Sequence, residues 1–149
     1  MIKTILLKLG LALLVLVVLG SVHGCKKDSG VNQGEIDRGL IEAYILENDI
    51  TGEFTSTGLF YKIIEPGDEV HPGLYSTVTV TYKGVTLSGQ AVDEGSFITF
   101  KLNELIIGWQ EGLQLIGEGG KIKLIIPSEM AYGKEVLVFD ITLHYFSNS

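Results

Sequence analysis

The part of the sequence that most constrains the fold is the stretch from Gly108 to Gly133, GWQEGLQLIGEGGKIKLIIPSEMAYG. Trp109, Leu113 and Ile116 are spaced i, i+4 and i+7, which predicts the apolar face of one short helix. A turn broken by three glycines and an alternating strand follow, and the stretch ends near a second large aromatic residue, Tyr132. A helix, a strand and two aromatic side chains this close together indicate the wall and floor of an apolar pocket.

Patterns of apolar and polar residues predict several strands around this helix. The predicted strands are 59–65, 76–83, 97–102, 121–126 and 137–145. In the clearest of them, 76–83, valines and a tyrosine alternate with threonines, as in an antiparallel strand with one buried face. Gly84, Gly89 and Gly95 are interpreted as short connections between strands. Together these features predict an α+β domain in which the apolar face of the sheet wraps around the helix.

A second helix is predicted before this domain. Its apolar residues recur at helical spacing and are Ile36, Leu40, Ile41, Tyr44 and Ile45. The pattern supports a helix over 35–48 within an N-terminal segment 35–50, and the main domain then covers 52–147. The sequence leaves open whether this helix packs on the domain or pairs with a partner.

The beginning of the chain has the character of an export signal. Residues 1–24 carry two lysines, then an apolar run at 9–19 and a short segment of small residues, as in a secretory signal. The apolar run is shorter than the about 20 residues that a membrane-spanning helix needs. Cys25 is the only cysteine, and its position resembles a bacterial lipobox, which implies lipid attachment at that residue. Residues 25–34 are polar and small, and we expect a flexible tether there.

The charge of the chain argues against nucleic acid as a partner. The sequence has 11 basic and 18 acidic residues, for a formal net charge of −7. Removal of residues 1–24 takes away two lysines and no acid, so the remaining charge is −9. Nucleic-acid binding depends on clusters of Lys and Arg, which this sequence lacks.

The sequence also lacks the motifs of nucleophilic, metal and phosphate chemistry. It contains neither a G-x-S-x-G elbow nor a Walker or dinucleotide-binding glycine pattern. The three histidines, His23, His71 and His144, are not at metal-ligand spacing, and His144 is expected on the outer face of the last strand. We therefore expect no metal and no cofactor, and an apolar pocket with few polar groups remains.

Several motifs resemble, in the same order, those of the FKBP-type peptidyl-prolyl cis-trans isomerases. They are VTVTYKG (78–84), Asp93, ITFKLNELIIGWQEGL (98–113), GGKIKLIIPSEMAYG (119–133) and LVFDITL (137–143). The resemblance extends from about Gly58 to Tyr145, and segment 35–64 is similar to the entry of secreted, lipid-anchored members. It implies an antiparallel half-barrel sheet wrapped around one short helix, preceded by an N-terminal helix.

The resemblance also implies the apolar part of a substrate pocket. Trp109 would form the floor beneath a substrate proline ring, and Tyr82, Phe139 and Ile98 would form walls. Val92 occupies a position where the family usually has an aromatic residue, so one wall would be smaller. The alternative for Trp109 and Phe139 is a purely structural role as core aromatics, which is the commoner use of inward aromatic residues.

The polar part of the pocket is implied in the same way. Leu105 and Ile106 would line the rim, and the Ile106 N–H would donate a hydrogen bond to a substrate carbonyl. Tyr132 would donate its hydroxyl to a carbonyl, and Asp93 would place a carboxylate near the rotating bond. The alternatives are a packing role at a strand end, with the hydroxyl in water, for Tyr132 and a turn role for Asp93.

Two connections that border the implied pocket are shorter than is usual in the family. They are 94–97, between Asp93 and the next strand, and 133–136, which replaces a longer glycine- and proline-rich loop. A Trp109 ring open toward the pocket would favour catalysis. A ring capped by Phe97 or Val136 would favour an inert binding module.

The resemblance implies an envelope isomerase that rotates X-Pro bonds in exported proteins, with proline-containing polypeptides as partners. A lipid at Cys25 would anchor it to a membrane, either the outer membrane facing the periplasm or the cell surface. The alternative is a catalytically weak or inactive FKBP-like domain that acts as a chaperone or partner-binding module. A further possibility, a subunit of an envelope assembly, rests on the lipid anchor and the helix at 35–48.

Overall fold

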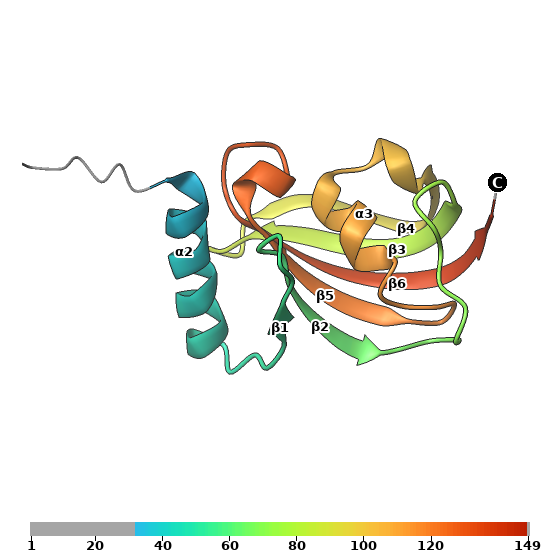
Figure 1. Cartoon of the computed structure of the whole chain (residues 1–149), viewed down its shortest axis with the longest axis horizontal. Coiled ribbons are helices and arrows are strands. Elements are labelled where there is room, and N and C mark those ends of the chain that lie inside the picture. Colours follow the sequence, from blue (N-terminus) through green and yellow to red (C-terminus); the bar gives the residue numbers. More distant parts are fainter. Residues whose placement is uncertain (1–31, 149) are drawn as a thin grey trace, which may run out of the picture. The chain divides into compact units, whose positions relative to one another are not determined.

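The computed structural model describes residues 32–148. The predicted signal at 1–24, the lipid site at Cys25 and most of the tether at 25–34 lie outside the described residues. The elements, in chain order (Figure 1), are α2 (Gln33–Glu47), β1 (Glu53–Phe54), β2 (Phe60–Glu65), β3 (Thr77–Thr86), β4 (Ala91–Lys101), the 3-10 helix η1 (Leu102–Glu104), α3 (Ile107–Leu113), β5 (Lys121–Ile126), the 3-10 helix η2 (Ser128–Met130) and β6 (Leu137–Ser147).

The N-terminal helix α2 begins two residues before the predicted start at residue 35. Asn32 is its N-cap, and the Asn32 side-chain oxygen accepts a hydrogen bond of 2.8 Å from the Glu35 N–H. This bond satisfies one of the free N–H groups of the first turn, which explains the earlier start. No helix within residues 32–148 combines the length and apolar character needed to cross a membrane.

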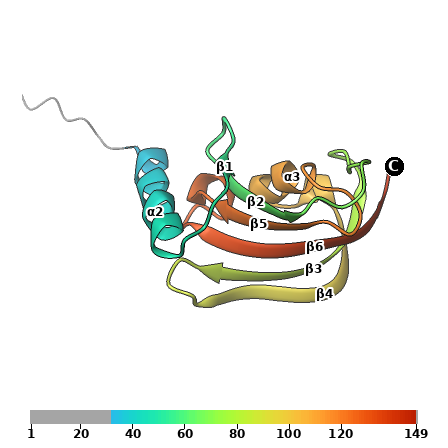
Figure 2. The same cartoon turned by 90° about the horizontal axis from the view of Figure 1, so that it is seen from below.

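The six strands form one antiparallel sheet in the order β1-β2-β5-β6-β3-β4. Figure 2 shows the curved sheet with α3 on one side and α2 across one end. We call the face covered by α3 the inner face and the opposite face the outer face. The α+β prediction, an antiparallel sheet wrapped around one short helix, is confirmed.

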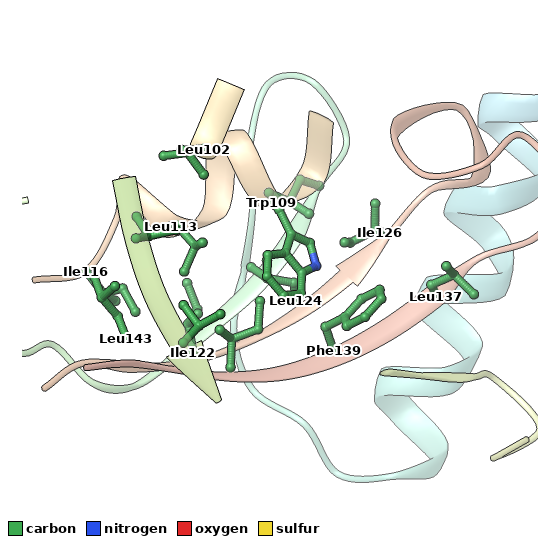
Figure 3. Close-up of a cluster of buried hydrophobic side chains, with 14 of the residues drawn as sticks. Leu102, Trp109, Leu113, Ile116, Ile122, Leu124, Ile126, Leu137, Phe139 and Leu143 are labelled. Atoms are coloured by element: carbon green, nitrogen blue, oxygen red, sulfur yellow. The ribbon is translucent and has the colours of Figure 1, made fainter. Parts of the chain in front are cut away.

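The main hydrophobic core lies between α3 and the inner face (Figure 3). Its fully buried members include Leu113, Ile116, Ile122, Leu124, Ile126 and Leu143. Two glycines allow α3 to lie directly on β5. A Cβ at Gly112 would stand 2.6 Å from Leu124 Cδ1, and one at Gly108 would stand 2.5 Å from Ile126 Cγ2. Larger residues at either position would push the helix off the strand.

A second, smaller cluster lies on the outer face, and we call it the outer patch. It consists of Ile41, Phe60, Ile125, Val136 and Val138. Because side chains alternate along a strand, residues next to core positions in sequence point to this opposite face. The helix α2 covers them through the fully buried Ile41 side chain, so α2 packs on the domain.

Two of the glycines interpreted as connections lie inside strands. Gly84 is in β3 and Gly95 is in β4, whereas Gly89 lies in the turn between them with a φ of 85°. A Cβ at Gly84 would overlap the ring of Phe139, and one at Gly95 would stand 2.8 Å from Tyr82 Cε1. These two glycines mark close approach of aromatic rings to the strand backbone, which a sequence pattern does not distinguish from a turn.

Candidate active site in an aromatic pocket

A cavity of about 140 Å³ opens between α3 and the inner face of the sheet. Its lining consists of Tyr82, Asp93, Phe100, Leu105, Ile106, Trp109, Tyr132 and Phe139. These residues come from β3, β4, β6, α3 and the segments that flank α3 and η2. The structure therefore brings together residues that are distant in sequence, around a space lined mostly by aromatic and aliphatic side chains.

Trp109 forms the floor of the cavity. Its side chain is only 4% exposed and lies edge-on to two other rings, at centroid distances of 5.0 Å from Tyr82 and 5.3 Å from Phe139. Edge-to-face contacts of this kind are the favoured arrangement of aromatic pairs. The buried Trp109 Nε1 has no hydrogen-bond partner among residues 32–148. An unpaired buried donor costs stability, so packing alone does not explain a tryptophan at this position.

Tyr82 and Asp93 form the polar wall. The Tyr82 hydroxyl donates a hydrogen bond of 2.9 Å to Asp93 Oδ2, and Asp93 Oδ1 accepts one of 2.9 Å from the Glu94 N–H. Desolvation by burial raises the pKa of Tyr82 to about 12, with further contributions from the hydrogen bond to Asp93 and from the charges of Asp93 and Tyr132. The hydroxyl therefore stays protonated, and both carboxylate oxygens are held in place.

Ile106 lies at the entrance to α3, with its carbonyl facing into the helix. The carbonyl accepts hydrogen bonds from the Trp109 N–H (3.0 Å) and the Gln110 N–H (3.1 Å). The Ile106 N–H itself makes no hydrogen bond within residues 32–148. This unpaired N–H belongs to a residue that lines the cavity and caps the helix carrying the floor.

Tyr132 stands at the mouth of the cavity and is 63% exposed. It follows η2 and precedes Gly133, which has a φ of 74° and so turns the chain back toward β6. The side chain lines the cavity although most of its surface is in contact with solvent. The Tyr132 side chain therefore combines a place in the cavity lining with a largely solvated surface.

Two residues expected in the pocket do not line it. Val92 is 41% exposed and Ile98 is 40% exposed, and neither borders the cavity. Ile98 lies beside Tyr82 at the edge of the inner face. A Cβ added at Gly95 would be in close contact with both side chains. Phe100 provides the wall instead, with its ring centroid 6.2 Å from that of Trp109. Ile98 and Phe100 are two apart on β4 and share a face, so alternation alone could have suggested Phe100.

The shortened connection at 94–97 is a bulge in β4. Tyr82 pairs with Gly95 while Val80 pairs with Ile98, so β4 has one extra residue there, and Phe97 has a φ of 54°. The Phe97 ring stacks on His144 at a centroid distance of 3.8 Å. Phe97 does not border the cavity, so it does not cap the Trp109 ring.

The second shortened connection, 133–136, also leaves the pocket uncovered. Val136 belongs to the outer patch and is 2% exposed, on the opposite face from Trp109. Within residues 32–148, no group of three or more His, Cys, Asp or Glu side chains is placed to hold a metal ion. The site therefore offers apolar contact, a free backbone N–H at Ile106, the unpaired indole N–H of Trp109 and a tyrosine–carboxylate pair.

Comparison with known proteins places these features in a family. The sequence model described as FKBP-type peptidyl-prolyl cis-trans isomerase matches residues 68–144, which is more than half of the chain. The FKBP-type peptidyl-prolyl cis-trans isomerase FkpA of Escherichia coli strain K12 is 43% identical over 102 residues, covering 60% of this chain and 38% of FkpA. The outer membrane protein MIP of Legionella longbeachae is 37% identical over 101 residues, covering 58% of this chain and 43% of MIP.

Solved structures agree with this assignment. The crystal structure of FkpA from Escherichia coli matches with a TM-score of 0.67 and 37% identity, covering 73% of this chain and 58% of that chain. A peptidyl-prolyl cis-trans isomerase from Pseudomonas syringae matches with a TM-score of 0.65 and 26% identity, covering 76% and 96%. The chain spans about two fifths of the length of the two curated relatives. The chain belongs to the FKBP-type peptidyl-prolyl cis-trans isomerase family.

Proposed function

We propose that this domain catalyses cis-trans rotation of X-Pro bonds in polypeptides, without a covalent step. The observation that carries the proposal is the cavity itself: an indole floor, aromatic walls, a free backbone N–H at Ile106 and a tyrosine–carboxylate pair. Rotation about an amide is slow because resonance sets a barrier of about 18–20 kcal/mol, and X-Pro bonds are those that populate both isomers. Nothing in this reaction requires a nucleophile or a metal.

The proposed mechanism uses the difference in polarity between the planar and the twisted amide. A planar amide is more dipolar, so a dry aromatic cavity stabilises the twisted state relative to the planar one. The proline ring would rest on Trp109 between Tyr82 and Phe139. The Ile106 N–H would donate to a substrate carbonyl and Tyr132 would donate its hydroxyl to another, so that only the bond before proline rotates. Asp93 would lie beside the rotating bond, with its orientation fixed by Tyr82.

The direct test is the refolding of a protein whose slow phase is limited by proline isomerisation. The full chain in detergent should accelerate the slow phase in proportion to its concentration, and a Trp109→Ala variant should not. Circular dichroism of both proteins would control for folding. A folded wild-type chain that leaves the slow phase unchanged at micromolar concentration would refute catalysis.

A second candidate, binding without catalysis, is favoured by the uncovered mouth of the pocket. Neither 94–97 nor 133–136 arches over the cavity, so contacts with residues beyond the proline are fewer. In that case a proline-containing peptide would quench Trp109 fluorescence on binding, while the slow refolding phase would not change.

We also propose an envelope location with a lipid at Cys25, which would join the domain to a membrane. The support is the signal-like order of residues 1–24 and the name of the MIP relative, an outer membrane protein. Metabolic labelling with a fatty acid analogue in a bacterial host should mark the wild-type chain but not Cys25→Ala. Equal labelling of both would refute lipid attachment at Cys25.

A further inference from the structure

The helix α2 carries a buried carboxylate that lies outside the aromatic cavity. Asp37 is only 1% exposed, and Asp37 Oδ2 accepts two hydrogen bonds from Ser128, one from the N–H (2.7 Å) and one from Oγ (2.6 Å). Asp37 Oδ1 accepts a third from Gln33 Nε2 at 2.7 Å. Burial of a carboxylate is costly unless it is fully hydrogen-bonded, so this geometry ties α2 firmly to Ser128.

Ser128 is in turn the anchor of the segment that carries Tyr132. The Ser128 carbonyl accepts hydrogen bonds from the Ala131 N–H (3.1 Å) and from the Gly133 N–H (2.8 Å). These two residues flank Tyr132 on either side. All the hydrogen-bonding groups of Ser128 are thus engaged, with its N–H and hydroxyl directed to Asp37 and its carbonyl directed to the neighbours of Tyr132.

Tyr132 depends on this backbone support because its own side chain is held by few neighbours. It is 63% exposed at the mouth of the cavity, whereas Ser128 is 1% exposed. A mostly solvated side chain gains little orientation from packing, so the backbone beneath it decides where the hydroxyl lies. Asp37 is connected to that backbone through two consecutive hydrogen bonds: Ser128 donates to Asp37, and the Ser128 carbonyl accepts from the Gly133 N–H.

We propose that Asp37 is a positioning residue for the isomerase reaction: by holding Ser128, it fixes Tyr132 at the mouth of the pocket. The inference rests on the proposed function, in which the Tyr132 hydroxyl holds a substrate carbonyl. It makes α2 a part of the active unit, although Asp37 does not touch the substrate.

A double-mutant cycle tests the proposal with the full chain, using kcat/KM for a proline-containing peptide. Asp37→Asn keeps an oxygen that can accept both hydrogen bonds from Ser128 but removes the charge that strengthens them, and it should lower kcat/KM by about three- to tenfold. In a Tyr132→Ala background the same change should have no further effect. An equal loss in both backgrounds would overturn the proposal, because Asp37 would then act through the general stability of the fold.

Two further variants separate positioning from folding. Ser128→Ala removes only the hydroxyl that donates to Asp37, so it should reproduce part of the Asp37→Asn effect even if Asp37→Asn fails to fold. Ile41→Val weakens the packing of α2 without touching Ser128 and should leave kcat/KM unchanged. A loss of kcat/KM with Ile41→Val as large as that with Ser128→Ala would overturn the proposal.

Amide hydrogen exchange distinguishes failure of this inference from failure of the proposed function. The Gly133 N–H should exchange faster in Asp37→Asn than in the wild type, and should be unchanged in Ile41→Val. An inactive wild-type chain would refute the proposed function, whereas unchanged Gly133 exchange in Asp37→Asn would refute the link between α2 and the Tyr132 segment.

Discussion

The two faces of this sheet both carry apolar clusters, yet only the inner cluster contributes residues, among them Trp109 and Phe139, to the aromatic cavity. On the outer face, the 15-residue helix α2 packs its Ile41 side chain against the cluster of Phe60, Ile125 and Val138. The side chains of all four residues are 2% exposed or less. On the inner face, α3 has only seven residues and reaches the sheet chiefly at β5. A short helix over a long, curved sheet leaves the aromatic end uncovered, so the pocket results from incomplete covering.

The largest effects are expected when one large buried aromatic residue is removed from each face. Trp109→Ala and Phe60→Ala should each lower the free energy of unfolding by about 3–5 kcal/mol, because both side chains are buried. Isomerase activity per folded molecule should be lost with Trp109→Ala and retained with Phe60→Ala. Urea unfolding combined with the refolding assay measures both quantities. Equal loss of activity in the two variants would show that the faces do not differ in function.

The next largest effect is expected at Gly84. An Ala there would overlap the Phe139 ring and should destabilise the protein by about 1–3 kcal/mol while displacing a pocket wall. Gly73→Ala is the matched control, because the nearest atom to its Cβ, Ser76 Oγ, would be 4.0 Å away. Peptide affinity, followed by Trp109 fluorescence, should fall only for Gly84→Ala. An unchanged affinity would mean that the Phe139 ring adjusts without affecting the pocket.

A smaller effect is expected for two tyrosine–carboxylate pairs, one inside the pocket and one outside it. Tyr82 donates to Asp93, and Tyr61 donates to Glu53 Oε2 at 2.8 Å. Tyr82→Phe and Tyr61→Phe should each cost about 0.5–1.5 kcal/mol at neutral pH. Only Tyr82→Phe should also reduce activity. Comparable activity losses in both would remove the distinction between the pairs.

The pH dependence of the same two pairs has a definite sign. The pKa of Tyr82 is raised to about 12 mainly by burial, and the pKa of Tyr61 is raised mainly by its hydrogen bond to Glu53. A raised pKa means that the stabilisation is complete below the unfolded value of about 10 and is lost as the pH rises through the folded value. The stability gap between wild type and Tyr82→Phe should therefore shrink from pH 10 upward. A gap that widens in that range would contradict the raised pKa.

The smallest effect is expected on the exposed side of α2. Gly39 is exposed in the interior of the helix, and nothing lies within 4 Å of an added Cβ. Gly39→Ala should therefore stabilise the protein by about 0.5–1 kcal/mol, since glycine is a poor helix former. Thermal unfolding measures the gain, and activity should be unchanged. A loss of activity would mean that this exposed side of α2 also contributes to the site.

The sequence predicted the helix around Trp109 and Leu113 and the strand 121–126 correctly, because both follow regular periods. The i+7 spacing also placed Ile116 on this helix, which was wrong: α3 ends at Leu113, and Ile116 joins the core from the segment after it. The sequence placed Trp109 and Tyr82 correctly on faces that line one cavity. It did not distinguish Ile98 from Phe100, since both share one face of β4 and only the curvature of the sheet sets their depth.

Asp37 was missed for a different reason. An acidic residue in the first turns of a helix usually faces solvent, where it stabilises the helix N-terminus. Its burial depends on Ser128, which is 91 positions away in the sequence, and no local pattern contains that information. The two strand glycines, Gly84 and Gly95, were wrongly predicted to be connections between strands. Glycine is needed there because an aromatic ring from another strand packs against the backbone.

The order of strands in the sheet determines where the chain can be cut to make a stable fragment. The family match begins at residue 68, but β1 and β2 precede it, and β2 pairs with β5 along the whole of Lys121–Ile125. A fragment cut at that boundary would leave β5 as a bare edge strand, with its backbone N–H and C=O groups free to pair with another chain. Such a fragment should self-associate. The smallest fragment suited to expression by itself, or to fusion with another protein, therefore begins before α2, at Asn32.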